Sequence, residues 1–148
     1  LLNRLQKKTP DIEFDIYGIN KVQPIWADHY FKTISNAKMG LNLSRGEAIK
    51  YYSSDRITQI VGNGLVCLID EKTSYRDFFS DTEMVFYKNE NDLSEKILKI
   101  SRDEKLRKSI AKKGKNKYMK YFNSTLVAKF ILEKTLGIKS KNKYFWHN

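Results

Sequence analysis

The sequence predicts a domain of the α/β class, in which a parallel sheet is flanked by helices and further helices gather at the C-terminus. Residues 65–69 and 84–87 are continuously apolar, as are strands that are covered on both faces of a parallel sheet. Strand and helix patterns alternate before a purely helical last part. The 148 residues and the hydrophobic fraction of 41% suit one domain over 1–148, with a non-periodic tail at 138–148.

The first quarter of the chain contains two helix patterns and two strand patterns. Apolar spacing predicts helices over 1–8 and 28–37. Residues 12–17 alternate apolar and polar side chains, which predicts a strand. Residues 22–26 predict a shorter strand at the sheet edge, because their proline cannot donate to a central ladder.

The centre of the chain predicts a strand, a long loop, a helix and a second strand. The three elements cover 39–43, 56–61 and 65–69. Residue types that cap helix N-termini precede the helix, and Gly62-Asn63-Gly64 stop it, since the left-handed conformation at a helix end favours Gly or Asn. The loop after such a first strand lies at the carboxyl end of the sheet, where α/β proteins bind phosphorylated ligands.

The second half predicts a short helix over 75–79, a strand over 84–87 and three more helices. Their N-terminal signals are Asp92 with Glu95, Ser101 with Glu104, and Asn123 with Ser124. Gly114 weakens the second of these helices. The side chains that we expect to be buried in the last helix are Leu126, Val127, Phe130 and Ile131. The tail residues Tyr144, Phe145 and Trp146 are too apolar to lack a packing partner.

The net charge of +11 lies entirely in the second part of the chain. Residues 1–87 hold 11 basic and 11 acidic side chains, whereas 88–148 hold 17 basic and 6 acidic ones. A basic half is typical of proteins that bind nucleic acid or an anionic membrane. Because no aromatic residues are regularly interleaved with the lysines, we do not expect a nucleic acid partner. Peripheral contact with an anionic membrane stays open.

The residue inventory disfavours several classes of site. Cys67 is the sole cysteine and sits in an apolar strand, which predicts a buried, inert thiol. His29 and His147 lack partners at metal-ligand spacing, so we expect no metal. No apolar run reaches 18 residues and no signal peptide opens the chain, so we expect a cytoplasmic protein. The absence of GxGxxG and Walker patterns disfavours NAD and ATP.

The loop at the carboxyl end of the predicted strand 39–43 holds side chains suited to a nucleotide diphosphate. They are Ser44, Arg45, Lys50, Tyr51, Tyr52, Ser53, Ser54 and Arg56. Other roles are open for five of them: Arg56 can pair with Asp55 or Asp70, Tyr51 and Tyr52 can be packing residues, and Ser53 and Ser54 can cap the helix.

Three segments, in order, carry a family resemblance. They are AKMGLNLSRG, SSDRITQIVGNGLVCLIDEKTSYRDFF and EMVFYKNENDLSEKILKISRDEKLRKSIAKKG. The set resembles the C-terminal, donor-binding domain of GT-B glycosyltransferases, in the spore-maturation-type, group 1-like branch, over roughly 11–136. This resemblance implies a Rossmann-like half of a GT-B fold that binds a nucleotide-diphosphate sugar. It also implies transfer to a glycan or lipid-linked acceptor in surface polysaccharide synthesis, with no cofactor or metal.

Position by position, the resemblance assigns roles to several residues. Arg56 matches a helix-start arginine, and Gln59 stands where many relatives have a glutamate that binds the donor ribose. The amide of Gln59 can still accept and donate hydrogen bonds, without the strengthening that a charge gives. The retaining E-x7-E pattern would have glutamate in place of Tyr51, and Glu47 is only a nearby substitute, so the stereochemical outcome is not predicted.

Sugar transfer builds negative charge on the leaving phosphate, which fixed positive groups stabilise. The candidates for this role are Arg45, Lys50 and Arg56. Tyr51 or Tyr52 would stack on the base, and Asp70 would bond a donor-sugar hydroxyl. The remaining candidates to bond the sugar or phosphate are Asn42, Ser44 and Ser53.

The resemblance also implies a second, N-terminal domain that supplies the acceptor site and usually the catalytic base. The chain opens without methionine in LLNRLQKK, a helix pattern already under way, so we expect a fragment that binds donor and catalyses little alone. The alternative is a non-catalytic α/β binding module whose basic helical face grips an anionic membrane or nucleic acid. A receiver-like domain is disfavoured, because no pair of acids ends the first strand.

Overall fold

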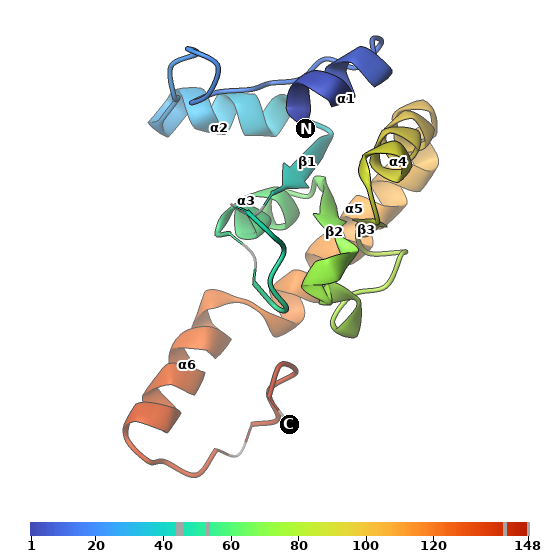
Figure 1. Cartoon of the computed structure of the whole chain (residues 1–148). Coiled ribbons are helices and arrows are strands. Elements are labelled where there is room, and N and C mark those ends of the chain that lie inside the picture. The colour runs from blue at the N-terminus through green and yellow to red at the C-terminus, as the bar shows by residue number, and fades with distance from the viewer. Residues whose placement is uncertain (44–45, 53, 141, 148) are drawn as a thin grey trace.

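The computed structural model describes residues 1–43, 46–52, 54–140 and 142–147. Within these residues the chain folds around a three-stranded parallel sheet in the order β1-β2-β3, with helices packed against it (Figure 1). The elements are α1 Leu2–Lys8, α2 Ala27–Asn36, β1 Met39–Asn42, α3 Arg56–Gly62, β2 Val66–Asp70, the 3₁₀ turns η1 Glu71–Thr73 and η2 Tyr75–Asp77, β3 Val85–Tyr87, α4 Glu90–Arg102, α5 Glu104–Tyr121 and α6 Ser124–Thr135. The predicted α/β class with a parallel sheet is confirmed.

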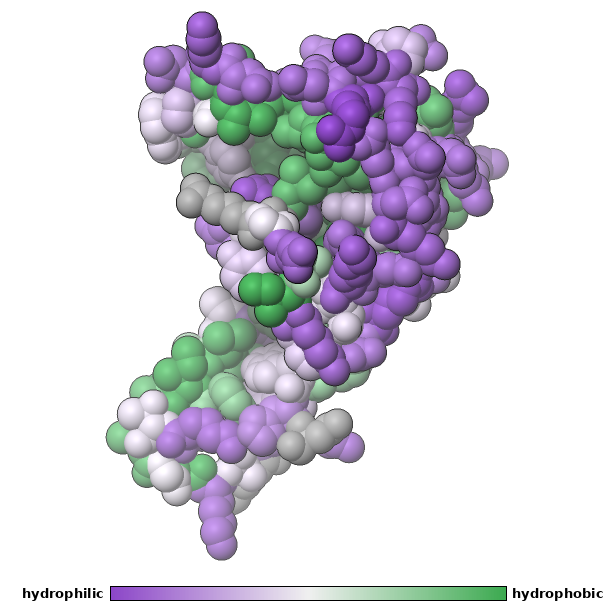
Figure 2. All heavy atoms as spheres, viewed as in Figure 1, coloured by the Kyte–Doolittle hydropathy of each residue, from purple (hydrophilic) through white to green (hydrophobic). Residues whose placement is uncertain are grey.

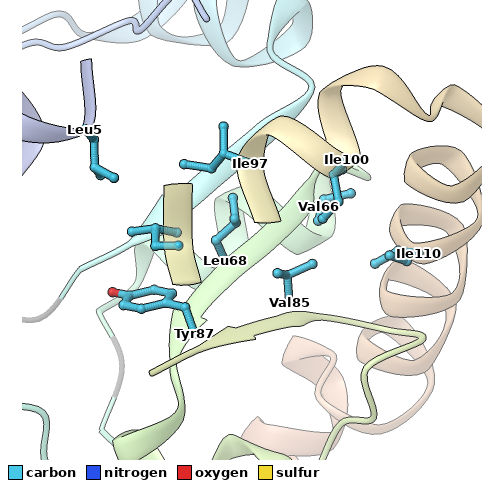
Figure 3. Packing of buried hydrophobic residues seen from close by; sticks show 9 residues of the cluster. Leu5, Val66, Leu68, Val85, Tyr87, Ile97, Ile100 and Ile110 are labelled. Carbon is cyan, nitrogen blue, oxygen red and sulfur yellow. The ribbon is translucent and has the colours of Figure 1, made fainter. Parts of the chain in front are cut away.

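The middle strand β2 is buried on both faces. Val66 and Leu68 belong to one hydrophobic cluster, which α1, α4 and α5 complete (Figure 3). Cys67 and Ile69 belong to a second cluster, built with α3 and the segment around η2. Burial raises the pKa of the Cys67 thiol to about 12, so the thiol stays protonated and unreactive, as expected.

The two strands expected near the N-terminus are wrong. Residues 12–17 and 22–26 are irregular backbone, and β1 has β2 as its strand partner. Asn20 and Lys21, in the turn between the two segments, have positive φ, so the chain reverses without forming a ladder. Phe14 still packs against the first cluster. The alternation in this segment therefore reflects burial on one side and not strand pairing.

Two helix caps also differ from expectation. α4 is capped by Asn89, whose side chain accepts hydrogen bonds from the backbone N–H groups of residues 91 and 92, so Asp92 is not the cap. α5 is capped by Asp103, because Ser101 still belongs to the last turn of α4. The helix expected over 75–79 is the single 3₁₀ turn η2. For α4 and α5, the side-chain hydrogen bonds of Asn89 and Asp103 to the first backbone N–H groups mark the boundary.

Helix α6 starts at the expected cap, Asn123, but its expected burial is wrong. Val127 is 38% exposed and Ile131 is 55% exposed. Figure 1 shows why: α6 projects away from the sheet and the helices that cover it. Both sides of α6 are apolar, so periodicity alone could not tell the packed side from the exposed one.

The C-terminal tail packs against α6 and the end of α5, as its aromatic residues predict. Tyr144 is 7% exposed, and its ring lies 5.0 Å from that of Phe130. The ring of Trp146 stacks at 5.5 Å on that of Phe122. This aromatic cluster fixes one side of α6 to the remainder of the domain.

Gly114 allows α5 to approach the segment before β3, and α5 continues through this residue. A Cβ atom at this position would lie 2.3 Å from the backbone carbonyl oxygen of Glu83. Backbone cannot move aside as the end of a flexible side chain can. The close approach therefore requires glycine, in spite of its low helix propensity.

Gly114→Ala is expected to destabilise the domain by about 1–3 kcal/mol, because the added methyl group must push α5 away from Glu83. Helix propensity alone would predict that alanine stabilises the domain. Urea denaturation measures the free energy of unfolding. Gly62→Ala in α3 is the control, since its Cβ would meet Met119 at an ordinary 3.6 Å. Equal stability of the Gly114→Ala variant and the original chain would contradict the close approach.

The side chain of Glu83 makes a second contact with α5, through Lys117. Its carboxylate accepts hydrogen bonds from the Ser80 N–H at 2.8 Å and from Lys117 Nζ at 2.9 Å. Burial raises the pKa of the Glu83 carboxyl, but the hydrogen bonds from Ser80 and Lys117 outweigh it and hold the pKa below its ordinary value. A carboxyl whose pKa is lowered by folding stabilises the fold only while it is ionised.

The stabilisation from Glu83 should therefore be complete above its ordinary pKa of 4.5 and lost as the pH falls through the lower folded-state pKa. At neutral pH we expect Glu83→Gln to lower the free energy of unfolding by roughly 1 kcal/mol. The difference should vanish in acid. Exposed Glu95 of α4, without an ion pair among the described residues, is the matched control. A difference that persists unchanged in acid would exclude this role.

Candidate functional site

The three parallel strands end at the same edge of the sheet. Asn42 is the last residue of β1 and pairs with Ile69, while Asp70, the last residue of β2, pairs with Tyr87, the last of β3. We call this region, with the loops that leave it, the carboxyl edge. It is the edge that the sequence predicts as the ligand-binding side of the sheet.

At the end of β1, the structure brings together Asn42, Ser54 and Arg56. Asn42 is 3% exposed, and its Oδ1 accepts a hydrogen bond from the Ser54 hydroxyl at 3.1 Å. Arg56 Nη1 donates to the Leu43 carbonyl at 2.9 Å. These hydrogen bonds fasten the start of α3 to the end of β1. Beyond the other end of α3, Gly64 has a φ of +78°, in the left-handed region.

Arg56 does not make the ion pair that was its alternative role. Within the described residues no carboxylate lies within salt-bridge distance of its guanidinium, and the residue is exposed. A guanidinium has five N–H donors, and the contact with Leu43 uses one nitrogen. Most of its N–H donors are therefore left for solvent or a ligand.

Tyr51 ties the loop after β1 to the segment after β2. Its backbone N–H donates to the Thr73 carbonyl at 2.7 Å, and its hydroxyl donates to Asp77 Oδ2 at 2.6 Å. Its ring packs 5.1 Å from that of Phe78, and Lys50 Nζ lies 4.8 Å from its centroid. Tyr51 has a φ of +61°, an uncommon value for a residue with a side chain, which these contacts maintain.

At the ends of β2 and β3 lie two further polar side chains. Asp70 Oδ1 accepts the Lys72 N–H at 2.9 Å and caps η1. Burial, and to a smaller degree the charge of Asp70, raise the pKa of Tyr87 to about 12. The phenol of Tyr87 therefore stays protonated at neutral pH. Sequence reasoning did not identify Tyr87 or Asp77 as members of this edge. Tyr87 could have been identified, because it is the last residue of the predicted strand that follows the one ending at Asp70.

Of the remaining predicted site residues, the structure describes Tyr52 and Gln59. Ser44, Arg45 and Ser53 lie outside the described residues. Tyr52 is 47% exposed. Gln59 lies half-buried on α3, where its backbone carbonyl accepts a hydrogen bond from Asn63 at 2.7 Å.

A large cavity lies along the outer side of β1, and Arg56 contributes to its lining. Its volume is about 940 Å³, and residues 11–17, α2, β1 and the C-terminal part of α4 line it. Figure 2 shows hydrophobic residues on the surface between the N-terminal helices and the sheet. The charged residues in its lining are Asp11, Glu13, Asp15, Lys38, Arg56 and Arg102. With as many acids as bases, this cavity offers a diphosphate little net attraction.

A smaller cavity of about 260 Å³ lies beside Tyr51. Its lining is almost wholly aromatic: Tyr51, Tyr75, Phe78, Phe79, Tyr118, Phe122 and Trp146, with Ile57. No cluster of three or more His, Cys, Asp or Glu side chains with a metal-binding arrangement occurs in the part of the chain that the structure describes. In the same part, no helix combines the length and apolar character needed to cross a membrane.

A comparison with known proteins identifies the family. Residues 1–133 match the family model described as glycosyl transferase-like. No curated protein and no solved structure matches the chain. Because the match covers most of the 148 residues and the fold is a parallel α/β sheet, the chain is a glycosyltransferase domain. It belongs to the glycosyl transferase-like family.

Proposed function

We propose that this domain binds a nucleotide-diphosphate sugar at the carboxyl edge, as the donor-binding half of a GT-B glycosyltransferase. The observation that carries the proposal is Arg56: an exposed guanidinium at the end of β1, free of carboxylate partners among the described residues. The family match supports sugar transfer as the reaction class. The acceptor in this proposal is a glycan or a lipid-linked sugar in surface polysaccharide synthesis.

Arg56 would act on the leaving group. When the bond between the anomeric carbon and the donor phosphate breaks, negative charge develops on the diphosphate. A guanidinium can form paired, charge-assisted hydrogen bonds with phosphate oxygens, which are stronger than neutral ones. Lys50 lies in the same loop, and Arg45, outside the described residues, remains a further candidate. Donor cleavage in this proposal needs no metal ion.

The other side chains of the edge suit the rest of a donor. Asp70 has one carboxylate oxygen engaged by Lys72, and its second oxygen can accept from a sugar hydroxyl. The amide of Gln59 can exchange hydrogen bonds with ribose hydroxyls. Tyr51 is held in place by Thr73 and Asp77, so its ring would be a rigid surface for a base. Tyr52 and Ser54 complete the set.

Arg56 borders both the carboxyl edge and the 940 Å³ cavity. In that cavity, the acids of residues 11–15 offset the bases, so its net attraction for a diphosphate is small. The cavity is large enough for an organic ligand, which makes it the natural competing location for the donor.

In the two-domain enzymes that the sequence resembles, the other domain contributes the acceptor site. We therefore propose that these 148 residues bind the donor but need a partner domain for efficient transfer. Donor binding, rather than turnover, is the appropriate readout for this chain.

Arg56→Ala should weaken binding of UDP or GDP about tenfold to a hundredfold, the range expected for the loss of a charge-assisted hydrogen bond. Isothermal titration calorimetry, first without metal and then with magnesium, measures the affinity and identifies the nucleotide. The matched control is Arg102→Ala, because Arg102 also lines the 940 Å³ cavity but is the last residue of α4, the helix that begins after the carboxyl end of β3.

The two arginine variants distinguish the two locations. Loss of affinity in Arg56→Ala with unchanged affinity in Arg102→Ala would support the carboxyl edge. Similar losses in both variants would locate the nucleotide in the 940 Å³ cavity. Failure of UDP, GDP and their sugars to bind the original chain at millimolar concentration would overturn the proposal of an autonomous donor site.

A further inference from the structure

The outer side of α6 is an apolar surface that the fold itself does not use. Val127, Ile131 and Leu132 are 38%, 55% and 59% exposed, and Leu136 and Ile138, just beyond the helix, are 66% and 55% exposed. We call these five residues the α6 face. At 100° per residue, Val127, Ile131 and Leu132 fall on one side of the helix. Figure 2 shows hydrophobic residues over the lobe that α6 and the tail form.

Lysines border the α6 face on both sides. With 3.6 residues per turn, Lys129 falls just beyond Leu132 around the helix, and Lys134 falls just beyond Val127 on the other border. Both lysines are exposed. Long basic side chains at the borders of an apolar stripe can keep their charge in water while their stems lie along apolar surface.

The opposite side of α6 is occupied. Phe130 packs on Tyr144, and the carboxylate of Glu133, the sole acid of this helix, accepts hydrogen bonds from the Tyr144 hydroxyl at 2.6 Å and from the Asn142 amide at 3.2 Å. The acid is therefore held toward the tail. The outer side is left apolar and basic, and one of its border lysines, Lys134, also contacts the Phe130 ring, with Nζ 5.7 Å from the ring centroid.

We propose that the α6 face binds the surface of a membrane that contains anionic lipid, with α6 lying in the plane of the bilayer. An apolar stripe bordered by lysines matches both layers of such a surface: apolar residues enter the boundary of the acyl chains, and the ammonium groups meet the anionic headgroups. The tail strengthens the match, since residues 138–148 contain three lysines and no acid. Nucleic acid would use the charge alone and leave the apolar stripe in water.

Vesicle co-sedimentation of the 148-residue chain tests this directly. We expect binding to phosphatidylcholine vesicles that contain phosphatidylglycerol, weak binding to phosphatidylcholine alone, and loss of binding at about 1 M salt, where charges are screened within about 3 Å. Removing the charges of Lys129 and Lys134 should weaken binding about fivefold per lysine. Ile131→Asp with Leu132→Asp should abolish it, because the apolar contact is lost.

Matched controls separate the α6 face from general charge and exposure. Phe31→Asp, in α2, removes an aromatic side chain that is 60% exposed, and the pair Lys112→Gln and Lys113→Gln removes two exposed charges of α5. Both controls should bind vesicles as the original chain does. Circular dichroism confirms that each variant is folded.

Two results would overturn the proposal. The first is equal binding to vesicles with and without anionic lipid, or binding that the Ile131→Asp, Leu132→Asp variant retains. The second is that the original chain does not bind vesicles but self-associates in sedimentation equilibrium, and that the Ile131→Asp, Leu132→Asp variant does not self-associate. The α6 face would then bind a second copy of the chain. Neither result bears on nucleotide binding at the carboxyl edge.

Discussion

The burial of β2 on both faces is the constraint on which the rest of the structure depends. Its side chains alternate between two hydrophobic clusters, so a slip of one residue would exchange the contents of both. The register with β1 and β3 is thereby fixed, and Asn42, Asp70 and Tyr87 end at one edge. The candidate site follows from this register, since the loop that leads to Arg56 at the start of α3 leaves from the end of β1.

Much of the fold could be predicted because strong local patterns and tertiary packing agree. The apolar runs correctly predicted the strands β2 and β3. The two glycines correctly predicted where α3 ends. Alternation over 12–17 was misleading, because one-sided burial produces the same pattern as a strand without supplying a ladder partner. The role of Gly114 was only partly predictable for a related reason: glycine is required by the close approach of Glu83, thirty-one positions earlier in the chain, which helix propensity does not include.

The candidate site, like the fold, could be predicted only in part. The residue types in the loop after β1 predicted an anion-binding edge, and the structure brings Asn42, Ser54 and Arg56 together there. The hydrogen bonds of Tyr51 to Thr73 and Asp77 join segments more than twenty residues apart, and no spacing rule predicts them. The exposure of α6 was unpredictable as well, because which of two apolar sides packs depends on the tail. The family match supports sugar transfer, and the geometry supports a location for the donor.

The location of the donor is the central claim, and amide chemical-shift mapping by NMR tests it most directly. The isotope-labelled chain would be titrated with the nucleoside diphosphate that binds best. We expect the largest shifts at Asn42, in residues 50–57 and at the start of η1, on both sides of Asp70. Shifts concentrated instead in residues 11–17, α2 and the end of α4 would put the nucleotide in the 940 Å³ cavity and contradict a donor site at the carboxyl edge.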